Sequence, residues 1–171
     1  MTKQELTSIV QSIHDEVNQY LESVDDTTLN TPRPNGKWSI AEEIGHLINA
    51  LQQSNKGFML PRFFLKYKFG INNRNEKNYE EVVEKYLGKL ATIPIPNNPF
   101  QIKEVEKIAK EKLLKSYKKE QEKFEKRLSK FSEKELSTYL LPHPLLGKLT
   151  LREFGYFTHY HTKHHLENIQ K

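Results

Sequence analysis

Four segments of the chain carry apolar residues spaced three and four apart, the spacing that places them on one face of an α-helix. Three of these segments begin with a capping box, in which a glutamate follows three residues after Thr2, Ser39 or Thr150. The remaining segment runs from about Phe100 to Phe131 and carries a dense mixture of Lys and Glu on its polar side. The pattern therefore predicts four long amphipathic helices.

The connection between the second and third predicted helices is unusually long, from Pro61 to Pro99. Such a length permits a crossover, which would allow these two helices to run parallel as well as antiparallel. Within it, apolar spacing between Tyr79 and Leu90 indicates a short helix, and the proline-rich stretch that follows is expected to be extended. Nothing between the helices alternates like a strand. We therefore predict an all-α fold, a four-helix bundle with a long crossover, in a single domain over residues 1–171.

Composition narrows the class of protein. A chain of 171 residues, 36% hydrophobic and 29% charged, is long enough for one substantial core. No stretch approaches the roughly 18–20 apolar residues of a membrane span, and the N-terminal segment lacks a secretory signal, so we expect a cytoplasmic protein without a membrane partner. The absence of cysteine excludes thiolate ligands and a cysteine nucleophile. The net charge of +5 is too small to indicate nucleic acid.

The last predicted helix carries four of the seven histidines, between His159 and His165. Residues four apart share one helix face, so His161 and His165 can bind a single metal ion through their imidazole nitrogens. His164 lies at the edge of this face and His159 nearly opposite. His161 and His165 alone do not complete a metal site, so the remaining ligands must come from elsewhere in the chain. The alternative interpretation is that both are ordinary core or surface histidines.

A third ligand is available on the second predicted helix. His46 lies off the apolar stripe there and shares its face with polar residues that would suit a pocket lining. A lone histidine in such a place is usually a partly exposed surface residue. The histidine pair on another helix favours a metal site.

Two segments together resemble the signature regions of the DinB/YfiT-like superfamily of bacterial metalloenzymes. They are Trp38–Leu47, at the start of the second helix, and His143–Ile169, along the fourth. The resemblance implies a four-helix bundle with a long crossover and a divalent metal held by His46, His161 and His165. It also implies a homodimer. The family includes thiol-dependent S-transferases and isomerases, although most of its members have no assigned reaction.

Three neutral ligands leave at least one coordination position of the metal open to water or a thiol. They also leave the metal its full positive charge, which lowers the pKa of the bound water or thiol and favours its anion. A metal-bound water or thiolate is the expected nucleophile toward a small-molecule substrate, and the thiol would be of low molecular weight. The sequence does not choose among zinc, nickel, iron and manganese. Glu43, one turn before His46, is a candidate acceptor or general base, and Asn168, where family members commonly carry Gln or Asn, is a candidate for orienting a ligand or substrate. The alternative for both is a solvated residue of the bundle.

Two function classes remain open. One is a metal-dependent transferase or hydrolase, and the other is a non-catalytic stress-related or interaction module with a vestigial metal site. They differ in whether the metal has an exchangeable position beside a cavity.

Other segments and histidines give weaker indications of function. The segment Pro61–Gly70 interleaves basic and aromatic residues, which can bind single-stranded nucleic acid but is more often a helix with buried aromatics and outward lysines. We expect the crossover to cover part of the pocket. His14 is expected at an exposed or boundary position, and His143 in the turn before the last helix.

Overall fold

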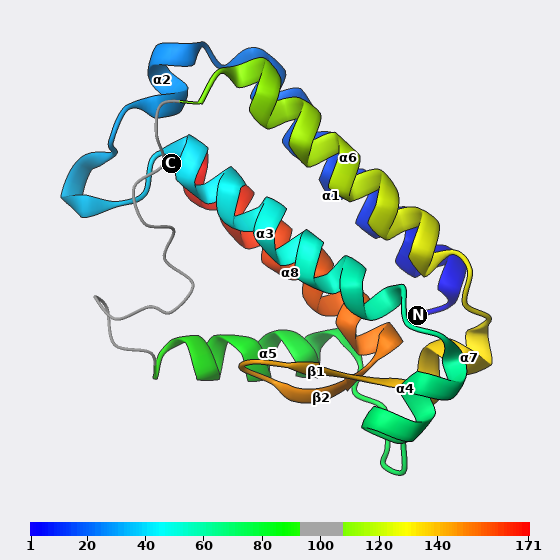
Figure 1. Cartoon of the computed structure of the whole chain (residues 1–171). Coiled ribbons are helices and arrows are strands. Elements are labelled where there is room, and N and C mark those ends of the chain that lie inside the picture. The colour runs from blue at the N-terminus through cyan, green and yellow to red at the C-terminus, as the bar shows by residue number, and fades with distance from the viewer. Residues whose placement is uncertain (93–107) are drawn as a thin grey trace.

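Four long helices carry most of the structure. They are α1 (Lys3–Ser23), α3 (Ile40–Phe58), α6 (Lys110–Leu128) and α8 (Leu151–Ile169). In the computed structural model, which describes residues 1–92 and 108–171, these helices lie side by side (Figure 1). The capping boxes predicted at Thr2, Ser39 and Thr150 are all formed. Helix α6 begins at Lys110, and the predicted start near Phe100 lies outside the described residues.

Helices α3 and α6 run in the same direction, as the long connection between them permits (Figure 1). The Asn55 amide donates to the backbone carbonyl of Glu120 at 3.0 Å, and further along both segments the Arg127 guanidinium approaches the Met59 sulfur at 3.6 Å. Contacts therefore advance in the same order along the two helices.

Helices α1 and α8 form the second parallel pair. Arg152 near the start of α8 donates to the carbonyl of Met1 at 2.8 Å, and the Tyr20 hydroxyl donates to the carbonyl of Ile169 at 2.8 Å near the opposite ends. Each of these helices runs antiparallel to its neighbour in the other pair, as the contact of Asn18 on α1 with Gln121 on α6 illustrates.

Shorter elements connect the long helices. They are α2 (Asp26–Asn30), a 3₁₀ turn (Pro34–Gly36), α4 (Arg62–Phe69), α5 (Tyr79–Leu90), α7 (Glu133–Thr138), β1 (Leu140–His143) and β2 (Gly147–Thr150). Helix α5 confirms the short helix predicted within the crossover. It packs along α8, so this segment of the crossover covers part of that helix (Figure 1).

The protein is mostly helical, so the predicted all-α class broadly fits, and a small two-stranded sheet is the one departure from it among the described residues. Strands β1 and β2 form an antiparallel hairpin in which Leu140 pairs with Thr150 and His143 with Gly147. Strands of four residues are too short to reveal an alternating pattern, and Pro142 interrupts the first of them. The left-handed φ of 72° at Gly147 closes the turn.

The start of α8 is fixed by a buried carboxylate. Glu153 is fully buried and accepts hydrogen bonds from the backbone N–H of Thr150 (2.9 Å), the backbone N–H of Lys77 (2.7 Å) and both terminal nitrogens of Arg74 (2.6 and 2.5 Å). Burial alone would raise the pKa of Glu153, but these donors hold it below its ordinary value. The segment that leads into α5 is thereby tied to α8.

Gly155 allows α1 and α8 to pack closely. A Cβ atom at this position would lie 3.0 and 3.1 Å from the two methyl carbons of Leu6. We expect Gly155→Ala to lower the free energy of unfolding by about 1–3 kcal/mol, because the packed core must shift to admit the methyl group. Denaturant unfolding monitored by circular dichroism measures this change.

Gly88→Ala is the matched control, because Gly88 lies in α5 with no atom within 4 Å of the added Cβ. Alanine is the better helix former, so this variant should be unchanged or more stable by up to about 1 kcal/mol. Equal stability of the two variants would contradict the close packing of α1 on α8.

Candidate metal centre

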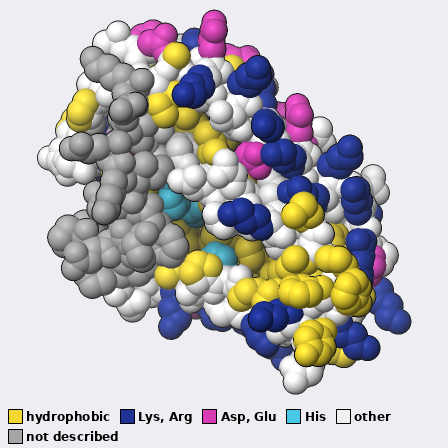
Figure 2. Space-filling view, in the orientation of Figure 1, with side chains coloured by type: hydrophobic (Ala, Val, Ile, Leu, Met, Phe, Trp, Pro, Cys, Tyr) yellow, Lys and Arg dark blue, Asp and Glu magenta, His cyan; other side chains and the backbone are white. Residues whose placement is uncertain are grey.

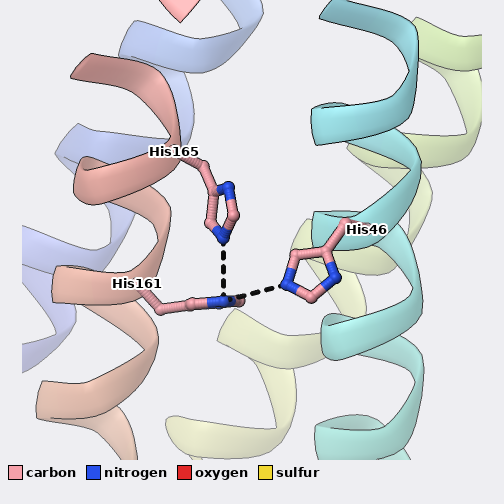
Figure 3. A group of neighbouring side chains, drawn as sticks. All are labelled: His46, His161 and His165. Atoms are coloured by element: carbon pink, nitrogen blue, oxygen red, sulfur yellow. Dashed lines mark hydrogen bonds between the residues drawn. The ribbon is translucent and has the colours of Figure 1, made fainter. Parts of the chain in front are cut away.

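Three imidazole rings converge between α3 and α8 (Figure 3). The Nε2 atoms of His46 on α3 and of His165 on α8 each lie 3.1 Å from Nε2 of His161. One nitrogen from each ring lies within 4.8 Å of the others. His161 and His165 are buried and His46 is half-buried. The structure thus brings together the three histidines that the sequence analysis selected as metal ligands.

The donor set suits a single divalent cation. Three nitrogen ligands about 2.0–2.1 Å from a tetrahedral ion are separated from one another by roughly 3.3 Å, close to the spacing of these rings. A hydrogen bond satisfies only one pair of imidazole nitrogens, whereas a cation accepts the lone pairs of all three. Within the described residues, no fourth Asp, Glu, Cys or His joins the group.

Glu43 determines how the His165 ring faces the centre. Its carboxylate oxygen Oε2 is hydrogen-bonded to Nδ1 of His165. Because a carboxylate only accepts, we assign the imidazole proton to Nδ1, which leaves the Nε2 lone pair directed at His161. Such a carboxylate–histidine contact fixes both the tautomer and the orientation of a metal ligand.

Arg33 completes this arrangement and was not found by the sequence analysis. One terminal nitrogen donates to Glu43 Oε1 at 2.6 Å, and the other guanidinium nitrogens donate to the backbone carbonyls of Trp38 and Asn168. The arginine therefore joins the loop before α3, the buried carboxylate and the end of α8. No local sequence pattern marks this contact, which depends on the tertiary fold.

Aromatic rings from α8 and α5 enclose His161. Phe157 stacks against it with centroids 5.0 Å apart, and Tyr86 meets it edge-on at 6.0 Å. Burial, reinforced by the neighbouring histidines, holds the pKa of His161 well below its usual value. The ring is therefore neutral at neutral pH and offers a lone pair. Burial also raises the pKa of Tyr86 to about 12.

Trp38 borders the other two rings. It lies 5.4 Å from the His46 ring and stacks parallel to the His165 ring at 6.5 Å. This tryptophan precedes the Ser39 capping box, so the start of α3 supplies one side of the site.

Free space beside the triad is small within the described residues. A cavity of about 10 Å³, enough for roughly one water molecule, lies between α3 and α8 next to His161, with Ser54 and Thr162 in its lining. A larger cavity of about 300 Å³ lies between α1 and α6, where Lys3 and Glu125 line it, and it does not include the triad.

Other predicted residues lie outside the triad. The Asn168 amide is 3.3 Å from Nε2 of His164, which is not one of the three converging rings. His159 bonds the Tyr79 hydroxyl at 2.7 Å on another side of α8. The expectation for His14 was wrong, because this residue is fully buried.

The burial of His14 has a clear cause. Its neighbours on the inward face of α1 are Val10, Ile13 and Val17, and its Nδ1 atom lies 2.9 Å from a carboxylate oxygen of Glu125 on α6. Glu125 thus compensates Nδ1, whereas Nε2 is buried with no hydrogen-bond partner among the described residues. A single-helix pattern does not reveal a partner on another helix.

His143 holds the turn of the hairpin, as predicted. Its Nδ1 accepts the backbone N–H groups of Leu145 and Leu146, each at 3.2 Å. Its ring also lies 4.1 Å from that of Phe157, which stacks on His161. Burial, assisted by the charge of Lys85, lowers the pKa of His143 to about 4.

The chain belongs to the DinB superfamily, because the model of that family matches residues 10–169. Membership agrees with the resemblance of the two signature segments and with the metal-compatible histidine cluster. A search of curated proteins and a search of solved structures each found no match. Among the described helices, none is sufficiently long and apolar to cross a membrane.

A divalent cation added to chelator-treated protein should raise the melting temperature, since a ligand present at 100 times its Kd stabilises the folded state by about 2.7 kcal/mol. His161→Ala should remain folded but lose this stabilisation and the bound metal. His164→Ala is the control on the same helix, because His164 is not one of the three converging ligands; its ring touches that of His165 edge-on at 5.4 Å, so the control also shows how much such a neighbouring contact matters. Elemental analysis and thermal melts provide the readout, and an unchanged metal content in His161→Ala would refute the assignment.

The depressed pKa of His143 makes stability depend on pH. The unfolded chain binds this proton near pH 6.5 and the folded protein only near pH 4, so the free energy of unfolding should fall as the pH drops between these values. The loss attributable to this residue is on the order of 3 kcal/mol. His143→Asn keeps an acceptor for the two N–H groups without titrating, so its pH dependence should be shallower.

Unfolding of both proteins at pH 4–8 in the presence of a chelator measures this difference. The two proteins differ only at position 143, so the difference between their curves reports the effect of this side chain. Parallel curves for the wild type and His143→Asn would exclude a contribution from His143.

Proposed function

We propose that this protein is a divalent-metal-dependent enzyme that acts on a small molecule, with a low-molecular-weight thiol as co-substrate. The convergence of three neutral imidazole nitrogens, without a fourth ligand among the described side chains, carries the proposal. Structural metal sites are closed by four protein ligands, whereas catalytic sites keep a position open. Membership of the DinB superfamily is consistent with a metal-dependent function.

A divalent cation held here supplies a Lewis acid whose charge its neutral ligands do not cancel. The residues of the chain hold and orient this centre. Glu43 accepts the Nδ1 proton of His165 and keeps its Nε2 lone pair on the centre, while Arg33 balances the buried carboxylate. Phe157 and Tyr86 pack against the His161 ring and, among the described residues, leave beside it only a cavity of about 10 Å³.

The thiol is part of the proposal because of the superfamily resemblance, and the composition of the chain fixes where its sulfur must come from. The sequence contains no cysteine, so sulfur chemistry at this site must use the sulfur of a small molecule. The superfamily resemblance, which includes thiol-dependent S-transferases, points in the same direction. Metal-dependent hydrolysis is the other reaction that the same donor set supports.

The proposal extends to the assembly. Helices α1, α3, α6 and α8 would form the four-helix bundle implied by the resemblance, within one domain spanning residues 1–171. The order of their contacts, with two parallel pairs, supports this arrangement. A homodimer, also implied by the resemblance, is a prediction for sedimentation analysis.

A direct test of function incubates metal-loaded protein with a panel of low-molecular-weight thiols and the electrophile monobromobimane. We expect thioether formation that requires both the cation and one class of thiol, falls to background in His161→Ala and persists in His164→Ala. Ester and amide substrates test hydrolysis in parallel. Stoichiometric metal binding with no turnover in any assay would instead favour the non-catalytic module with a vestigial site.

Glu43→Gln tests the positioning of His165 separately. It removes the charge that holds the Nδ1 proton, so metal affinity should weaken by roughly 10–100-fold while the fold persists. Glu167→Gln makes the same charge change at an exposed position of α8 and should leave the affinity unaltered. Isothermal titration with zinc gives both values, and equal affinities would show that Glu43 does not support the site.

A further inference from the structure

Helix α4 presents an apolar and basic face to solvent. Tyr67 is 89% exposed, Phe63 75% and Met59, just before α4, 63%. Phe63 and Tyr67 are four residues apart and therefore project from the same side of the helix. Lys66 and Lys68 are exposed beside them. These five residues are called the α4 surface below, and apolar and basic side chains are mixed at this end of the molecule (Figure 2).

The α4 surface is firmly supported from below. Leu65 is fully buried, and the Arg62 guanidinium lies 4.2 Å from the centre of the Phe131 ring. Arg62 also donates to Glu135 at 3.0 Å and to the carbonyl of Lys130 at 2.7 Å. The exposed side chains therefore project from a fixed element, and the prediction that the aromatics of this segment are buried was wrong for Phe63 and Tyr67.

The chain segment that carries the α4 surface has charge of one sign, and the nearby Glu135 is paired with Arg62. Residues 44–75 contain five Lys or Arg and no Asp or Glu. Arg62 and Arg74 are paired with glutamates from other segments. Lys66 and Lys68 form no ion pair with any described residue. A partner that binds this surface must therefore supply negative charge for the lysines and an apolar environment for Met59, Phe63 and Tyr67.

We propose that the α4 surface binds an anionic lipid bilayer at the level of its headgroups, an interaction beyond the proposed enzymatic function. Aromatic side chains favour the membrane–water interface, and neighbouring lysines attract anionic headgroups. Side chains as exposed as Phe63 and Tyr67 can insert into a lipid bilayer, because a bilayer deforms around them and does not need a pocket of matching shape. The sequence analysis expected no membrane partner because the chain contains no span, but peripheral binding requires none.

Two other occupants fit the α4 surface less well. A second copy paired through the same face would bring the lysines of both copies together, which is unfavourable. Single-stranded nucleic acid would use the aromatic rings for stacking, but the aliphatic side chain of Met59 offers no stacking face.

Co-sedimentation with vesicles tests the proposal. The protein should bind vesicles of phosphatidylcholine and phosphatidylglycerol and be released by high salt, with little binding to phosphatidylcholine alone. Lys66→Gln with Lys68→Gln should lower the partition coefficient by roughly 30-fold. Phe63→Ser with Tyr67→Ser, which keeps both lysines, should lower it by about tenfold or more. Thermal melts verify that each variant is folded.

Lys115→Gln with Lys119→Gln is the matched control, since it makes the same net-charge change at exposed positions of α6. This control should retain most of the binding. Equal loss in the control, equal binding to phosphatidylcholine alone, or no binding to anionic vesicles would each overturn the proposal. So would lipid-free dimerisation or oligonucleotide binding that disappears in the Phe63→Ser, Tyr67→Ser variant, because the surface would then have a different occupant.

Discussion

The hydrogen bond between Glu43 and His165 is the contact on which the candidate metal centre depends. It joins α3 to α8 and sets which imidazole nitrogen faces the other two rings. A buried carboxylate is costly unless it is paired and fully hydrogen-bonded, which explains why Arg33 reaches it from the preceding loop. The same arginine binds the carbonyl of Asn168, so the charge that orients one metal ligand also holds the end of α8.

Helix α8 is held near both ends while its histidines lie between the anchors. Glu153 ties its first turn to Arg74 and Lys77, and the last turn is bound by Tyr20 and Arg33. Helices α1, α3 and α5 all pack against it. Little freedom remains for this helix to shift, so the two ligands that it carries are presented in a fixed geometry, which a catalytic metal site requires.

The features predicted correctly from sequence are those with local causes. Capping boxes gave the starts of α1, α3 and α8, because a cap depends on residues three apart. The common helix face of His161 and His165 was also predicted correctly, because it depends only on their spacing of four residues. Convergence with His46 was expected from spacing and family resemblance together, and the structure supplies the distances.

The features that were missed depend on partners distant in sequence. Arg33 is recognisable only once the loop, α3 and the end of α8 have come together. His14 was expected at an exposed or boundary position, although its place among Val10, Ile13 and Val17 was a signal of burial that could have been used. The hairpin was missed because four-residue strands show no period, and Gly147 was its strongest local sign.

The centre also joins segments that are far apart along the chain. His46 and His161 are separated by 115 residues, and α4, α5, α6 and α7 all lie between them. Helices can form locally within about a microsecond, but this contact closes a very long loop and must await the docking of α8 on α3. A bound ion is therefore a reporter of completed tertiary assembly. Cobalt, which absorbs visible light when bound by such ligands, would colour only those molecules in which the two helices have met.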